Sequence, residues 1–242
     1  AVHVNVVKNL ANDCCAPKLH LTDIGIDFQD WTNNYVWVHK PLAPFFLQAL
    51  IYKIGGERLL AFRLPSFLFA LMSIAALFFV ARRHFGYIIA IISTSLFAFN
   101  SYVFELVKGR QFSGLHDLMF VFFGILALDQ ILDIIRHPKN GFLPLAGARG
   151  KEGVKGLTDD HPTLTLSPSA GRELKKEYLL FGLFAGLGYL SKGGLALLFF
   201  PALFAASIVA DDRKQSIFNF LFAVLLAFTV IFPEKIALLV LY

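Results

Sequence analysis

The chain has 242 residues, of which 57% are hydrophobic and 16% are charged, and its mean hydropathy is +0.64. Soluble domains carry about 25% charged residues, so this composition excludes a globular enzyme with a fully hydrated surface. The net charge is +5, but the basic residues form no single stripe, which argues against nucleic acid as a partner. The composition predicts an integral membrane protein.

Six apolar runs approach the roughly 20 residues that a transmembrane helix needs. In chain order they are Leu64–Val80, Tyr87–Phe104, Leu118–Leu128 continued by Ile131–Ile135, Tyr178–Ser191, Gly193–Ala210 and Gln215–Pro233. We therefore predict an all-α, polytopic membrane protein with about six transmembrane helices.

The chain divides into four parts by composition. Residues 1–58 form an external loop in which Ala1–Ala11 and Pro41–Tyr52 predict juxtamembrane helices at the membrane surface. Residues 59–136 and 178–242 contain the transmembrane helices. Residues 137–177 are expected to be a disordered cytoplasmic insertion, because six glycines and three prolines within Gly141–Lys176 interrupt any helical period there.

The connections between the apolar runs alternate between rich and poor in basic residues. Arg82 and Arg83 follow the first run, Arg136 follows the third and Arg213 follows the fifth. Connections rich in lysine and arginine stay in the cytoplasm. This places residues 1 to about 60, the Lys108–His116 connection and the turn near Lys192 on the outer side.

Three polar features share that predicted outer side. They are His39-Lys40-Pro41, the connection with Arg110, His116 and Asp117, and the turn with Lys192. Together they predict a cavity for an anionic head group such as a lipid phosphate. Lys40, Arg110 and Lys192 would bind the phosphate, and Asp117 and His116 would act on a metal ion or a hydroxyl group.

Each of these features also has a plainer interpretation. Lys192 can be a turn residue whose ammonium group reaches the interface, and Lys40 can be an interfacial anchor. Asp129 and Asp133 lie on one helical face near the other end of the third run. They can be partly solvated interface carboxylates or part of a site.

Five motifs in order resemble the GT-C membrane glycosyltransferases, in the bacterial branch related to protein O-mannosyltransferases and the lipid A aminoarabinose transferase. They are H-K-P-L, E-R-L-L-A-F-R-L-P-S, A-R-R-H-F-G, V-K-G-R-Q-F-S-G-L-H-D and G-L-G-Y-L-S-K-G-G. The likeness extends from about residue 1 to 233, apart from the insertion at Gly141–Lys176. Lys40-Pro41-Leu42 has one proline fewer than the Lys-Pro-Pro-Leu motif of these proteins, and Ser191 stands where they have threonine.

The resemblance implies an activity and its partners. It implies transfer of a sugar from a polyprenyl-phosphate carrier to a lipid, glycan or protein acceptor, outside a bacterial inner membrane. Lys40 would contact the carrier phosphate, and a divalent metal ion is a candidate cofactor near Asp117. The catalytic Asp-Glu pair of the family, and a preceding span, are expected directly before Ala1. Within the chain, Asp13 is the nearest alternative for that base.

Two other interpretations stay open from the sequence. A secondary transporter would place its charges near the middle of the membrane and repeat its halves, whereas no repeat is visible here and the ionisable residues gather near the ends of the apolar runs. An inactive glycosyltransferase fragment would keep the fold and lack the general base.

Overall fold

The computed structural model describes residues 2–13, 17, 40–56, 58–108, 114–136, 176–209 and 213–241, and every element within them is helical. The elements are α1 (Val2–Asn12), α2 (Ala43–Gly55), α3 (Leu59–Phe85), α4 (Tyr87–Ala98), α5 (Ser101–Lys108), α6 (Gly114–Arg136), α7 (Lys176–Lys192), the 3₁₀ helix η1 (Gly193–Leu198), α8 (Phe199–Val209) and α9 (Arg213–Leu241). The predicted all-α class is confirmed. The predicted insertion lies outside the described residues, except that α7 already begins at Lys176.

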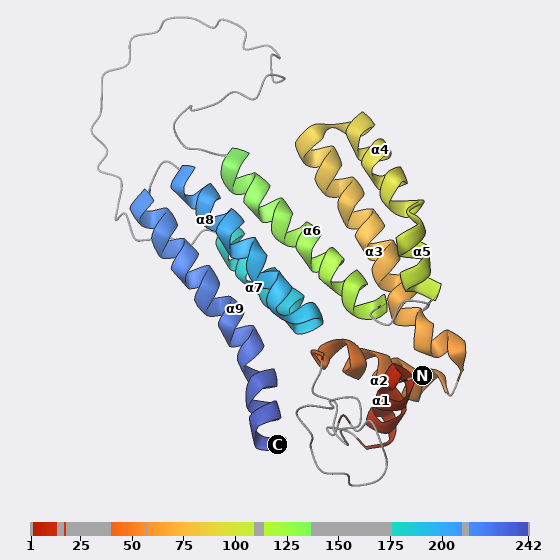
Figure 1. Cartoon of the computed structure of the whole chain (residues 1–242). Coiled ribbons are helices and arrows are strands. Elements are labelled where there is room, and N and C mark those ends of the chain that lie inside the picture. The colour runs from red at the N-terminus through yellow and green to blue at the C-terminus, as the bar shows by residue number, and fades with distance from the viewer. Residues whose placement is uncertain are drawn as a thin grey trace, which may run out of the picture.

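The long helices lie side by side, and α1 and α2 pack together across one end of the bundle (Figure 1). We call this end the α2 end and the opposite one the Arg136 end. Val6, Val7 and Leu10 of α1 are buried against Phe45 and Tyr52 of α2. The two helices predicted in the N-terminal segment are thus present, and they share a small core of their own.

Four helical segments are long and apolar enough to cross a membrane. They are Leu59–Phe85, Gly114–Arg136, Lys176–Ile208 and Gln215–Ile236, and the bent pair α4 and α5 makes a fifth if it counts as one span. The polytopic membrane architecture is therefore confirmed. Each of the six predicted apolar runs corresponds to a helix or a pair of consecutive helices.

The third of these segments turns back on itself. A straight helix of 33 residues would be about 50 Å long, yet the Tyr178 hydroxyl lies 3.2 Å from the Ser207 hydroxyl. Phe181 and Phe200 also pack edge to face, with ring centroids 5.7 Å apart. Thus α7 and α8 form an antiparallel hairpin, and η1 with Lys192 is its turn, as the sequence predicts.

The prediction that the second apolar run, Tyr87–Phe104, forms one uninterrupted helix is wrong. The axis bends by 50° between α4 and α5. The Asn100 side-chain oxygen accepts a hydrogen bond from the backbone N–H of Tyr102 at 2.8 Å. Asparagine commonly begins a helix in this way, so Asn100 ends the preceding segment and starts α5 in a new direction.

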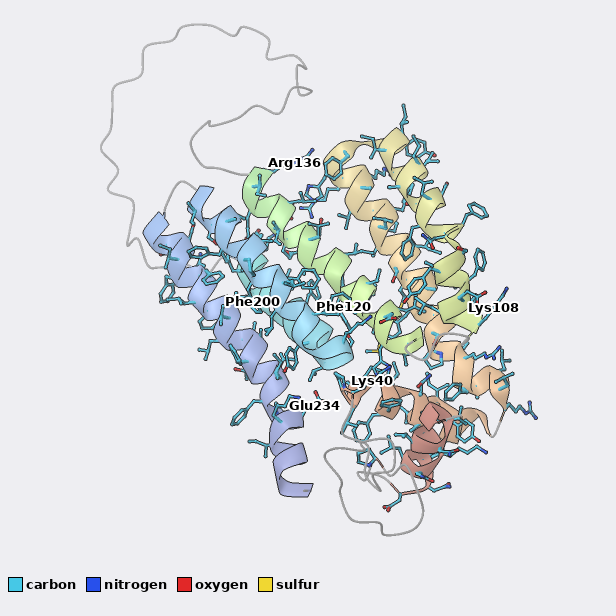
Figure 2. All side chains as sticks on the ribbon, in the orientation of Figure 1. Lys40, Lys108, Phe120, Arg136, Phe200 and Glu234 are labelled. Carbon is cyan, nitrogen blue, oxygen red and sulfur yellow. The ribbon has the colours of Figure 1, made fainter. Side chains whose placement is uncertain are left out.

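Basic residues of the helix connections lie where the charge pattern predicts. Arg82, Arg83 and Arg136 come together at the Arg136 end. Lys40 lies at the α2 end (Figure 2), and Lys192 is close enough to affect its charge. The N-terminal segment adds further basic residues to the α2 end.

Small residues bring α7 and α9 into close contact. Gly182 and Gly186 lie one turn apart on α7 and face Ala223 and Ala227, which are fully or almost fully buried. A side chain at Gly182 would place its Cβ 2.5 Å from the Ala223 carbonyl oxygen. Close approach of helix backbones over small residues is typical of membrane helix pairs.

We expect Gly182→Ala to lower the stability of the folded chain by about 1–3 kcal/mol, because the added methyl group must push the α9 backbone away. The midpoint of thermal unfolding in detergent measures this. Gly194→Ala is the matched control, since a Cβ there meets no atom within 4 Å. Equal midpoints for the two variants would contradict this packing.

Candidate active site

The site begins with the first turn of α2. Pro44 stands in that turn, and Leu42 precedes it without a side-chain cap of its own. The first N–H groups of a helix have no partner inside the helix. Glu234 of α9 supplies one, since its Oε1 accepts a hydrogen bond from the Leu42 N–H at 2.8 Å. The turn that carries Lys40 is therefore attached to a helix that lies 192 residues later in the chain.

A second contact fixes the same turn from α6. The Nε2 atom of His116 lies 3.3 Å from the carbonyl oxygen of Pro41 and donates to it in the matching tautomer. The His116 ring is buried and meets Phe45 edge to face, with centroids 4.6 Å apart. His116 therefore contacts the backbone of the residue that follows Lys40.

Asp117 is the central charge of the site. It lies in the first turn of α6 and is almost fully buried. Its Oδ1 forms an ion pair with the Lys192 Nζ, and its Oδ2 accepts a hydrogen bond from the Tyr102 hydroxyl at 3.2 Å. A carboxylate this deeply buried needs such partners, because an unpaired buried charge is very costly.

Lys40 lies within electrostatic range of both members of this ion pair. Partial burial lowers the pKa of the Lys40 ammonium group, the Asp117 carboxylate opposes that shift, and the positive charge of Lys192 adds to it. Among the described residues, two ammonium groups thus lie close to the Asp117 carboxylate. Their positive charge suits the binding of an anion.

A cavity of about 300 Å³ adjoins the ion pair between α4, α5 and α6. Asp117, Lys192, Tyr102 and Asn100 form its polar part. Its remaining lining is apolar and comprises Phe97, Val103, Leu106, Leu118, Phe120 and Val121. A ligand with an anionic head and an apolar chain suits this division.

The structure brings together most, but not all, of the predicted site residues. Lys40, His116, Asp117 and Lys192 meet at the α2 end. His39 and Arg110 lie outside the described residues, so the prediction for Arg110 stays a prediction. Glu234 was not predicted from the sequence. It is a charged residue at the end of the last apolar run, on the same predicted side as Lys40, and this position could have identified it.

The residues around Asp117 do not fit a metal ion in this structure. His116 and Asp117 are consecutive on a helix and point in different directions. Moreover, the His116 Nε2 atom contacts the Pro41 carbonyl, while a lysine and a tyrosine bind the Asp117 carboxylate. We therefore derive no chemical step through a metal at this position.

Asp129 and Asp133 belong to a separate network at the Arg136 end. Arg83 binds both carboxylates, at 3.2 and 2.7 Å, and the His84 Nε2 lies 2.8 Å from Asp129. Arg136 donates hydrogen bonds to the carbonyl oxygens of Arg83 and His84, in the last turn of α3. Histidine and aspartate atoms lie close enough here to hold a metal ion, and in this structure Arg83 is paired with both carboxylates.

Residues 39–149 match the family model of the dolichyl-phosphate-mannose-protein mannosyltransferases. The resemblance to the GT-C membrane glycosyltransferases is confirmed. The match supports a membrane glycosyltransferase of this type, and it contains Lys40, His116 and Asp117 but neither Lys192 nor Glu234. It is shorter than the predicted likeness at both ends. No curated protein and no solved structure matches the chain.

We expect Asp117→Asn and Lys192→Met each to lower the free energy of unfolding by about 1.5–3 kcal/mol, the range for hydrogen bonds to charged groups. Each change leaves the other charge without its partner. The double variant should lose less than the sum of the two single losses, because no unpaired charge remains. Thermal unfolding of all four proteins in detergent measures the coupling.

Lys53→Met is the control, since Lys53 is an exposed lysine at the end of α2. It should leave the unfolding midpoint unchanged. Additive losses for Asp117→Asn and Lys192→Met would show that the two side chains do not interact in solution.

Proposed function

We propose that the chain transfers a sugar from a polyprenyl-phosphate carrier to an acceptor hydroxyl or phosphate group, on the outer face of a bacterial inner membrane. The observation that carries this proposal is the group of Lys40 and Lys192 around the Asp117 carboxylate, beside a largely apolar cavity. The family match over residues 39–149 supports the same class of reaction.

Lys40 and Lys192 would bind the phosphate of the donor. Lysine binds phosphate as a point charge, and both ammonium groups belong to one cluster. The isoprenoid chain would lie along the apolar side of the cavity lined by Leu118 and Phe120. Asp117 would orient Lys192 and the Tyr102 hydroxyl through the ion pair and the hydrogen bond described above.

The transfer itself is a displacement at the anomeric carbon. The acceptor oxygen forms a bond to that carbon while the bond to the carrier phosphate breaks with inversion, and the bonding electrons leave with the phosphate. A carboxylate accepts the acceptor proton, a contribution of about 10²–10⁴-fold in rate. The lysines stabilise the negative charge on the departing phosphate.

Asp117 is poorly suited to be that base, because each of its oxygens already has a partner, Lys192 on Oδ1 and Tyr102 on Oδ2. We propose that the base is the acidic pair implied by the family resemblance, and that Asp117 is a positioning group. The basic helix connections at the Arg136 end support an outer location of the α2 end.

A secondary transporter fits the described residues less well. Its ionisable residues would lie near the middle of the membrane. In the described part of the chain the two charged clusters instead lie at opposite ends of the bundle, around Asp117 and around Asp129. This separation favours a site at the membrane surface.

We expect Lys40→Ala to weaken the binding of a polyprenyl phosphate about 10- to 100-fold, because one hydrogen bond to a charged group is lost. Native mass spectrometry of the chain in detergent, titrated with polyprenyl phosphate, measures the affinity. The unphosphorylated polyprenol should bind wild type and variant equally. Lys53→Ala is the matched control, and an unchanged affinity of Lys40→Ala for the phosphate would contradict the proposal.

The binding of polyprenyl phosphate should weaken as the pH rises towards the ordinary lysine pKa of about 10.4, and this weakening should begin at a lower pH than an exposed lysine would cause. Burial lowers the pKa of Lys40, so Lys40 loses the positive charge that binds phosphate before an exposed lysine would. The phosphate has its second pKa near 6, so its own charge hardly changes in the alkaline range where lysine titrates. Lys40→Arg, which keeps its proton, should preserve the affinity over this range. An identical pH profile for wild type and Lys40→Arg would exclude Lys40 as the titrating group.

A further inference from the structure

Glu234 connects the two halves of the site. It lies near the end of α9, directly after Pro233, in a part of the chain that the family match does not reach. Its hydrogen bond to the Leu42 N–H is the long-range polar contact that α9 makes to the N-terminal segment among the described residues. Leu42 is two residues from Lys40, so this contact bears directly on where the ammonium group lies.

The backbone around Lys40 has little freedom once this bond is formed. Glu234 binds the N–H of Leu42, and His116 contacts the carbonyl oxygen of Pro41. Pro41 also lies close to Gly193, since a Cβ at that glycine would be 3.7 Å from the proline Cγ. The Lys40 turn is therefore fixed between α6, α9 and the hairpin turn that carries Lys192.

The two carboxylate oxygens of Glu234 have different surroundings. Oε1 accepts the Leu42 hydrogen bond, whereas Oε2 is buried and has no hydrogen-bond partner among the described residues. A negative charge near the beginning of a helix is favourable, which offsets part of the cost of burying the carboxylate. The contact with α2 therefore explains its position.

We propose that Glu234 is a positioning residue that fixes the Lys40 turn through the Leu42 N–H and so sets the distance between the two phosphate-binding lysines. This inference rests on the proposed function for its consequence in donor binding. The hydrogen bond itself can be tested without any activity. The essential property of Glu234 is an acceptor oxygen at this place, which glutamine also provides.

The experiment compares Glu234→Ala and Glu234→Gln in the full chain in lipid nanodiscs. Hydrogen–deuterium exchange of peptides that cover Lys40–Phe45 reports on the bond, because Pro41 and Pro44 have no N–H and few amides contribute. The affinity for polyprenyl phosphate is measured on the same proteins. Thr229→Ala is the control on α9, since its exposed hydroxyl bonds only to a carbonyl of its own helix.

We expect Glu234→Ala to speed exchange in these peptides and to weaken polyprenyl phosphate binding about tenfold, the lower end of the effect of removing Lys40 itself. Glu234→Gln should keep both exchange and affinity within about twofold of wild type, because the acceptor is retained. Thr229→Ala should change neither.

Two results would overturn the inference. Unchanged exchange in Glu234→Ala would show that the bond does not hold the turn. Equal loss of binding in Glu234→Gln and Glu234→Ala, with exchange preserved in Glu234→Gln, would assign Glu234 a role through its charge. Failure of the proposed function looks different, because the wild-type chain would then bind polyprenyl phosphate no better than polyprenol. In that case Glu234 would be only a helix cap.

Discussion

The ion pair between Lys192 and Asp117 joins the turn of the α7–α8 hairpin to the first turn of α6. The rest of the site is arranged around it. Asp117 also binds the Tyr102 hydroxyl of α5, and Lys40 lies near enough to feel both charges. Because the carboxylate is almost fully buried, leaving it without partners would be very costly, and this requirement brings separate elements of the chain together.

The surrounding apolar medium explains why the ionisable groups occupy two separate clusters. A charge near the middle of a membrane is very unfavourable, so the helices carry their charges close to their ends. At the Arg136 end Arg83 binds both Asp129 and Asp133, and Arg136 binds the last carbonyl oxygens of α3. At the α2 end, among the described residues, Lys40 and Lys192 lie around the Asp117 carboxylate. The contacts of the first cluster join helices and suit a structural role, whereas the lysines of the second suit the binding of an anion.

The arrangement of the helices could be predicted well from the sequence, because apolar runs and chain order determine which helix ends lie together. The same reasoning placed Lys40, Asp117 and Lys192 at one end of the bundle. The break before α5 was missed because an apolar run shows no interruption where Asn100 begins a new helix.

The contact of Glu234 with Leu42 could not be predicted from local pattern, because it depends on how α9 packs against α7. That packing is set by Gly182 and Gly186, which allow the backbones to approach closely. Likewise, nothing in the spacing of Arg136 shows that its guanidinium group binds the last carbonyls of α3. These contacts arise from tertiary structure, and the sequence alone predicts only which end of the bundle each residue occupies.

The central claim is that Lys40 and Lys192 bind the same phosphate. An experimental structure of the chain in nanodiscs with bound polyprenyl phosphate tests it most directly. We predict phosphate oxygens within hydrogen-bond distance of both Nζ atoms, with the isoprenoid chain leaving along the side of the cavity that Leu118 and Phe120 line. A phosphate bound elsewhere, with the Lys40 and Lys192 ammonium groups making no contact to it, would contradict the account.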